Sequence, residues 1–261
     1  MPYSKTVWDE NTAITPARLN NLETQYEKAM EDAVTEAKQM VQYYVATTGN
    51  DNNSGASGSP FKTIQRAVNE AYKTIAGRVR INIAPGTYTG DVEIENLMCP
   101  LIEFFGDDET NTTIVGNIDI ANAQWVRIFR LKLRDGAYGI ISSNGLHKLT
   151  VDDVIIDNKT IAGIYLANVE MVEVGSTSIN ANGHAIECRT VGNLRVNNVQ
   201  ISGVQASGVR ISEGSFAYTS GLTGNIGSVP VHSVHASLLI KGSSTITGGA
   251  DTKSDVGQIF E

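Results

Sequence analysis

The 261-residue sequence has only two cysteines, and charged residues make up just 18% of it. Cys99 and Cys188 lie far apart along the chain. Cys188 falls at a repeated position that Leu166 and Ile211 fill elsewhere, so we expect it to pack as a small buried hydrophobic residue. We therefore expect neither a disulfide bond nor a catalytic thiol.

Long apolar runs and basic clusters are also missing. No run of 18 apolar residues is present, and no charged start precedes an apolar core, so we expect neither membrane insertion nor a classical secretion signal. A net charge of −8 without a basic stripe excludes a protein that tracks nucleic-acid phosphates. Glycine (25 residues), asparagine, serine and threonine are plentiful, which is typical of turn-rich β structure.

An apolar pattern recurs every 22 to 23 residues through the second half of the sequence. Four sets share one internal spacing: Val126, Ile128, Leu131 and Leu133; Leu149, Val151, Val154 and Ile156; Val172, Val174, Thr177 and Ile179; Leu194, Val196, Val199 and Ile201. Such a period is typical of solenoids, and each repeat is too short to include a helix. The pattern predicts an all-β solenoid, a right-handed parallel β-helix of about seven coils.

Three parts are expected along the chain. Residues 1–16 form an N-terminal arm, residues 17–45 form one long α-helix, and residues 46–261 form the β-helix, with a capping helix over 61–74. The long helix has a narrow apolar seam that begins with Leu19, Leu22 and Tyr26. A seam this narrow favours a self-associating coiled coil over the alternative, which is packing on the body of the chain.

Three short segments carry a family resemblance. The run Tyr44-Val-Ala-Thr-Thr-Gly49-Asn-Asp51, the segment Pro60-Phe-Lys-Thr-Ile64-Gln-Arg-Ala67 and the turn Pro85-Gly86-Thr-Tyr88 resemble the opening of pectate-lyase-like right-handed β-helix proteins. The resemblance implies a capping helix before the first coil. It does not imply one activity, because that superfamily includes lyases, hydrolases, epimerases and viral tailspikes.

The segment from Trp8 to Glu23 resembles the N-terminal segment of tail, fibre and appendage proteins of phages that infect Gram-positive bacteria. That resemblance implies a homotrimeric virion protein that is anchored to other virion proteins through its N-terminus. The residues that would anchor it are Trp8, Ile14, Leu19 and Leu22.

Outward positions between the ladder residues are where chemistry is expected. One column is Arg127, Thr150, Glu173, Arg195 and Ala217; a second is Asp119, Ile141, Tyr165, Glu187 and Arg210; a third is Lys132, Ile155, Ser178 and Gln200. Cleavage of a glycan by general acid and base needs paired carboxylates. Glu173 or Glu187 would be that carboxylate, with Arg195 or Arg210 as a substrate clamp; alternatively, these are ordinary surface ion pairs.

Tyr138 and Tyr165 are candidates for stacking on sugar rings, with packing between coils as the alternative for Tyr165. His232 and His235 are a possible metal pair, and Asp51 and Asn53 are possible calcium ligands or simply turn-capping residues. No cofactor is expected. Two further expectations concern the C-terminal part: Phe216 and Tyr218 continue the apolar ladder, and residues 219–234 form an insertion.

These observations favour a structural or host-attachment protein located on a phage particle, which presents its β-helix surface to host glycans or virion proteins. We expect it not to be an enzyme, since no outward column collects enough carboxylates. The alternative is a polysaccharide lyase or glycoside hydrolase acting on cell-wall or capsular polysaccharide.

Overall fold

The computed structural model describes residues 15–38, 40–225, 229–234, 238–242, 244–247, 249–254 and 258–260. In chain order the elements are α1 (Pro16–Lys38), β1 (Met40–Val45), α2 (Ile64–Ala71), β2 (Arg78–Ile83), β3 (Gly86–Thr89), β4 (Val92–Glu95), β5 (Leu101–Gly106), β6 (Thr112–Val115), β7 (Ile118–Arg134), β8 (Tyr138–Lys159), β9 (Ala162–Gly175), β10 (Ser178–Ala181), β11 (His184–Asn197), β12 (Gln200–Ser202), β13 (Ser207–Ser212), β14 (Phe216–Ser220), β15 (Leu222–Asn225), β16 (Val229–Val234), β17 (Leu238–Lys241), β18 (Ser244–Thr247), β19 (Thr252–Ser254) and β20 (Gln258–Phe260).

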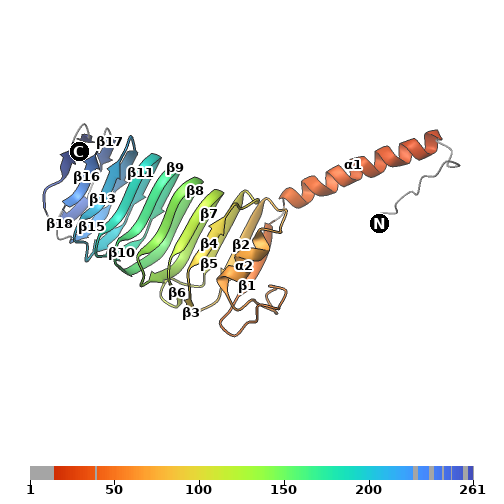
Figure 1. Ribbon diagram of the computed structural model, residues 1–261, viewed down its shortest axis with the longest axis horizontal. Helices are drawn as coiled ribbons and strands as arrows, with labels where there is room; N and C mark the ends of the chain where they lie inside the picture. The colour runs from red at the N-terminus through yellow and green to blue at the C-terminus, as the bar shows by residue number, and fades with distance from the viewer. Residues whose placement is uncertain are drawn as a thin grey trace.

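The strands stack into a parallel β-solenoid of about seven turns, as the repeat predicts (Figure 1). Each coil pairs in register with the next, so that Val126 lies beside Leu149, Leu149 beside Val172, and Val172 beside Leu194. Stacked strands lie about 4.8 Å apart, so each such column places one side chain per coil.

The longer strands bend where one face of the solenoid passes into the next. At several bends a non-glycine residue has a positive φ, as at Asn122, Asn168 and Asn198. Asparagine tolerates this left-handed conformation better than most residues, which explains why asparagine recurs between the apolar sets.

Inward side chains form apolar ladders along the solenoid. Both cysteines belong to this core and are free thiols, as expected. Cys188 lies between Leu166 and Ile211 in the column that the sequence predicts. Burial raises the pKa of Cys99 to about 11 and also raises that of Cys188, which leaves both thiols protonated at neutral pH.

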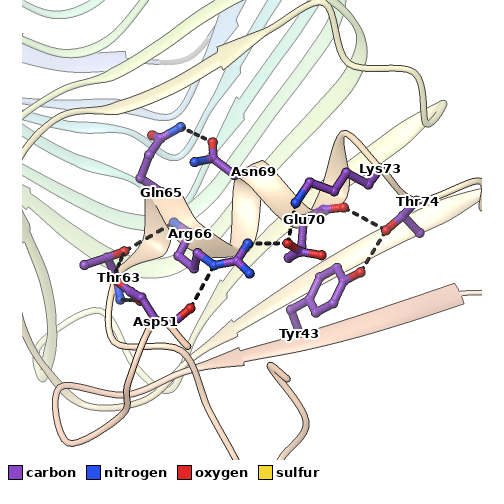
Figure 2. Close-up of polar contacts among 9 residues, drawn as sticks. All are labelled: Tyr43, Asp51, Thr63, Gln65, Arg66, Asn69, Glu70, Lys73 and Thr74. Atoms are coloured by element: carbon purple, nitrogen blue, oxygen red, sulfur yellow. Dashed lines mark hydrogen bonds and ion pairs between the residues drawn. The ribbon is translucent and has the colours of Figure 1, made fainter. Parts of the chain in front are cut away.

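The N-terminal end of the solenoid is capped by α2, which is shorter than the expected 61–74 (Figure 2). Asp51 fastens the preceding loop to this helix: its carboxylate accepts from the Lys62 and Thr63 amides, each at 2.9 Å, and from the Thr63 hydroxyl. The Asn53 side-chain amide donates to the Pro60 carbonyl at 2.8 Å. These contacts agree with the turn-capping interpretation of Asp51 and Asn53.

The expectation of one helix over 17–45 is wrong at its C-terminal end, because α1 ends at Lys38 and the solenoid begins with β1. Residues 40–45 contain two valines and two tyrosines, which favour a strand, and they pair in parallel with β2. Figure 1 shows α1 projecting from the end of the solenoid. Its seam is exposed, with Leu19 at 48% and Tyr26 at 67%, so packing on the body of the chain is not observed and self-association remains a prediction.

The expectations for the C-terminal coils need two corrections. Leu194 pairs with Ala217 rather than Phe216, so Ala217 and Thr219 point inward while Phe216 and Tyr218 lie on the outside. The repeat at this coil is 23 residues, one longer than the spacing assumed for the ladder. Residues 219–234 are not an insertion, because β15 and β16 pair with β12 and β13 as ordinary coils. In the part of the chain that the structure describes, neither helix is long and apolar enough to cross a membrane.

Candidate functional site

A column of outward side chains on one face of the solenoid carries most of the predicted site residues. The pairing places Ile141 beside Tyr165, Tyr165 beside Glu187, Glu187 beside Arg210, and Arg210 beside His232. Tyr138 starts the same strand as Ile141 and contacts Tyr165. Together with the neighbouring His184 and Arg189, these residues form what we call the Tyr165 cluster: Tyr138, Tyr165, His184, Glu187, Arg189, Arg210 and His232.

Glu187 is the centre of the cluster, and its side chain is only 6% exposed. Its Oε1 atom accepts from the Arg189 guanidinium at 2.9 Å and from Arg210, while the His184 imidazole lies 3.9 Å from Oε2. A buried carboxylate is retained only when it is paired in this way, and removing one partner leaves an uncompensated charge. The two arginines more than neutralise Glu187, so the cluster has a net positive charge at neutral pH.

Two tyrosine rings flank these charges. The Tyr138 and Tyr165 rings lie 5.7 Å apart and are tilted by 53°, and the Arg189 guanidinium lies over the Tyr165 ring at 5.6 Å. Both tyrosines are half-buried, so each ring packs between coils and still presents part of its surface. The packing and binding interpretations of Tyr165 are therefore compatible.

Two histidines lie at the edge of the cluster. Burial lowers the pKa of His184, with a further lowering from Arg210 that outweighs nothing of the opposing effect of Glu187 alone, and burial and then Arg210 lower the pKa of His232. Both imidazoles are therefore neutral at pH 7. His235 lies outside the described residues, so its pairing with His232 stays a prediction. Within the described ranges, no group of three or more His, Cys, Asp or Glu side chains is arranged to hold a metal ion.

Glu173 and Arg195 lie elsewhere, on the face formed by β2, β5 and the later parts of β7, β8, β9 and β11. Arg195 lies beside Glu173 in register, but the ion pair of Glu173 is with Lys148 at 3.0 Å. Thr150, Asp152 and Asn197 join them around an open hollow of about 250 Å³. The first outward column is confirmed in this part, except that Tyr218 and not Ala217 follows Arg195.

The structure does not bring Glu173 and Glu187 together. The residue of the Glu173 coil that lies beside Glu187 is Tyr165, eight positions before Glu173. Eight residues of extended strand span about 26 Å, and the chain bends between the two faces, whereas paired glycosidase carboxylates lie within about 10 Å. The two carboxylates therefore cannot act on one glycosidic bond.

The sequence reasoning missed a second cluster on the face of Glu173. Glu103 is 1% exposed and accepts from Arg78 at 2.6 Å, Arg80 at 3.0 Å and Arg127 at 2.8 Å. Arg80 lies over the Phe105 ring, and Arg127 over Trp125 and Phe129. The signal was present, because Arg80 and Glu103 precede Arg127 in its column by one coil each.

The predicted anchor is described only in part. Leu19 and Leu22 lie on α1 and are 48% and 38% exposed, which leaves them available to a partner. Trp8 and Ile14 lie outside the described residues.

The Tyr165 cluster is chemically suited to binding. Aromatic rings provide a stacking surface for sugars, and guanidinium and imidazole groups provide hydrogen bonds. A search of curated proteins and a search of solved structures each find no match. A family model matches residues 47–248, which is most of the chain and covers the solenoid with its cap. The chain therefore belongs to the family DUF1565, whose description is a protein of unknown function.

Proposed function

We propose that this protein is a host-attachment component of a phage or prophage particle: a spike, fibre or appendage whose N-terminal segment joins virion proteins and whose solenoid wall binds a host glycan. The assembly is a homotrimer, with the exposed seam of α1 forming a coiled coil. The resemblance of the segment from Trp8 to Glu23 supports the virion anchor. The exposure of Leu19, Tyr26 and Met30 supports self-association.

The observation that carries the binding role is the convergence of the Tyr165 cluster. Five residues that the sequence selected separately (Tyr138, Tyr165, Glu187, Arg210 and His232) lie on one face over consecutive coils. Two adjacent tyrosines with a fixed array of charged donors fit recognition of a polar saccharide, and an acidic saccharide would also benefit from the excess positive charge.

Binding is favoured over catalysis because of how Glu187 is held. Both arginines bind its Oε1 atom, and no second carboxylate of the described chain belongs to the Tyr165 cluster. A glycosidase needs two such groups. Glu187 therefore serves to position Arg189 and Arg210, and the depolymerase alternative has no paired acid and base.

The test is incubation of the full-length protein with purified wall teichoic acid and a panel of capsular polysaccharides. We expect retention of the protein on at least one polymer, without release of reducing ends or unsaturated products. Product release that Glu187→Gln abolishes would establish the depolymerase instead. Failure to bind every polymer on the panel would remove the support for host attachment through glycans.

A further inference from the structure

One face of the solenoid differs in composition from the other outward surfaces. We call it the aromatic face and define it by the outward positions of β1, β2, β5, residues 125–129 of β7, 148–152 of β8, 171–175 of β9, 193–197 of β11, β14 and β17. Its large apolar side chains are Met40, Tyr44, Leu101, Phe105, Trp125, Phe129, Met171, Phe216, Tyr218, Leu238 and Ile240. The outward column on the opposite side is instead Thr87, Thr113, Lys132, Ile155, Ser178, Gln200, Thr223 and Thr245.

These side chains remain partly uncovered. Met40 is 41% exposed, Met171 39% and Tyr218 40%, while Leu101, Phe105, Trp125 and Phe129 are half-buried beneath arginine side chains. Enrichment in aromatic residues, methionine and arginine is the composition of protein–protein interface cores. The face is roughly 30 Å long and 16 Å wide, or about 500 Å² before side-chain relief is counted, which approaches the area per partner of a standard interface.

The two edges of the aromatic face complement each other. Residues n and n+4 of one strand both point outward and lie at nearly the same height, because the strands run across the solenoid axis (Figure 1). At successive heights one edge carries Leu101, Trp125 and Lys148, and the other carries Phe105, Phe129 and Asp152. The edges therefore pair apolar with aromatic at two heights and cation with anion at the third.

Asp152 strengthens this match. It is half-buried, and its carboxylate makes no hydrogen bond or ion pair with another described residue. Lys148 is held at the opposite edge by Glu173 at 3.0 Å, with its ammonium 4.6 Å from the Trp125 ring. A second copy related by rotation about an axis parallel to the solenoid would bring Lys148 and Asp152 together at one height, and such a head-to-tail contact closes into a ring.

We infer that the aromatic face is the subunit interface of the assembly, and that its occupant is a second copy of this chain, with the Leu101–Trp125–Lys148 edge of one copy against the Phe105–Phe129–Asp152 edge of the next. This rests on the homotrimer of the proposed function, and it locates the contact on the solenoid in addition to α1. The two contacts are continuous, since α1 leads into β1, which is the first strand of the aromatic face.

The test is cysteine cross-linking in the full-length protein. In Trp125→Cys/Phe129→Cys the two sulfurs belong to residues about 13 Å apart in one strand, too far for a bond within a chain, so oxidation should yield covalent trimers. The native Cys99 and Cys188 are 2% and 0% exposed and contribute little background. The control is Thr87→Cys/Ser178→Cys on the opposite face, which should remain uncross-linked.

A second variant guards against misfolding of the double cysteine chain. Asp152→Lys should raise the dissociation constant of the solenoid contact at least tenfold in sedimentation, whereas Asp153→Lys, its exposed neighbour at the bend, should not. A trimer that neither cross-links above the control nor responds to Asp152→Lys overturns the inference and leaves trimerisation through α1 intact. A full-length protein that sediments only as a monomer overturns both.

Discussion

Individual ionisable side chains are buried at the turns of this solenoid as well as on its walls. Lys159 is fully buried, and its ammonium donates to the Gly116 carbonyl at 2.8 Å and to the Asp135 carbonyl. Burial lowers its pKa to about 8, although the nearby carboxylates of Asp135, Asp91 and Asp157 act in the opposite direction. The amine thus replaces the water or ion that would otherwise satisfy two carbonyls from neighbouring coils.

Lys159 should make stability depend on pH. Between about pH 8 and 10.5 the unfolded chain retains the proton that the folded chain loses, so the free energy of unfolding should rise with pH by roughly 2 to 3 kcal/mol from this residue. The raised pKa values of Cys99 and Cys188 act with the opposite sign. The measurement is therefore the difference between wild type and Lys159→Met in urea unfolding at pH 7.5, 8.5 and 9.5. A difference that is flat or falls with pH would contradict the assignment.

At the scale of elements, the sequence predicted the ladders better than it predicted the ends of helices. The step of 22 to 23 residues aligned Leu149, Val172 and Leu194 correctly because a register error would move every inward side chain outward. The helix over 17–45 was extended too far because Met40 and Tyr44 continue a helical spacing as well as a strand alternation. Pairing with β2 decides between the two, and no local pattern reports it.

The same reasoning explains the other misses. Phe216 was assigned to the core because it is large and apolar, yet one additional residue in that coil places the smaller Ala217 inside. Glu103 was missed because an isolated glutamate between phenylalanines gives no local sign of its three arginine partners, which come from strands 23 to 25 residues away.

The cap offers a direct test at this scale. Asp51→Ala removes three hydrogen bonds that join the loop to the start of α2, and the Thr63 and Lys62 amides lose their acceptor (Figure 2). We expect a loss of about 1 to 3 kcal/mol in the free energy of unfolding, measured by chemical denaturation. Glu109→Ala, at an exposed loop position, is the matched control. Equal stability of the two variants would show that Asp51 does not fasten the cap.

At the scale of the whole molecule, the solenoid separates its surfaces by composition. The Tyr165 cluster, the aromatic face and the threonine-rich column lie on different sides of one continuous core, so each can contact a different partner without rearrangement. Their columns were predictable from the sequence once the period was known, including the third, in which Lys132, Ile155, Ser178 and Gln200 are confirmed as neighbours. The contacts across columns were not predictable, because they depend on side-chain directions that the period leaves open.

The central claim is that this wall binds glycan through the Tyr165 cluster. The most direct measurement compares the affinities of wild type, Tyr165→Ala and Tyr218→Ala for the polymer that retains the protein, by isothermal titration calorimetry. Tyr218 is an exposed tyrosine of the aromatic face and serves as the control. The account predicts an affinity loss of about tenfold or more for Tyr165→Ala, or about 1.4 kcal/mol, and no change for Tyr218→Ala. Unchanged binding by Tyr165→Ala would contradict it.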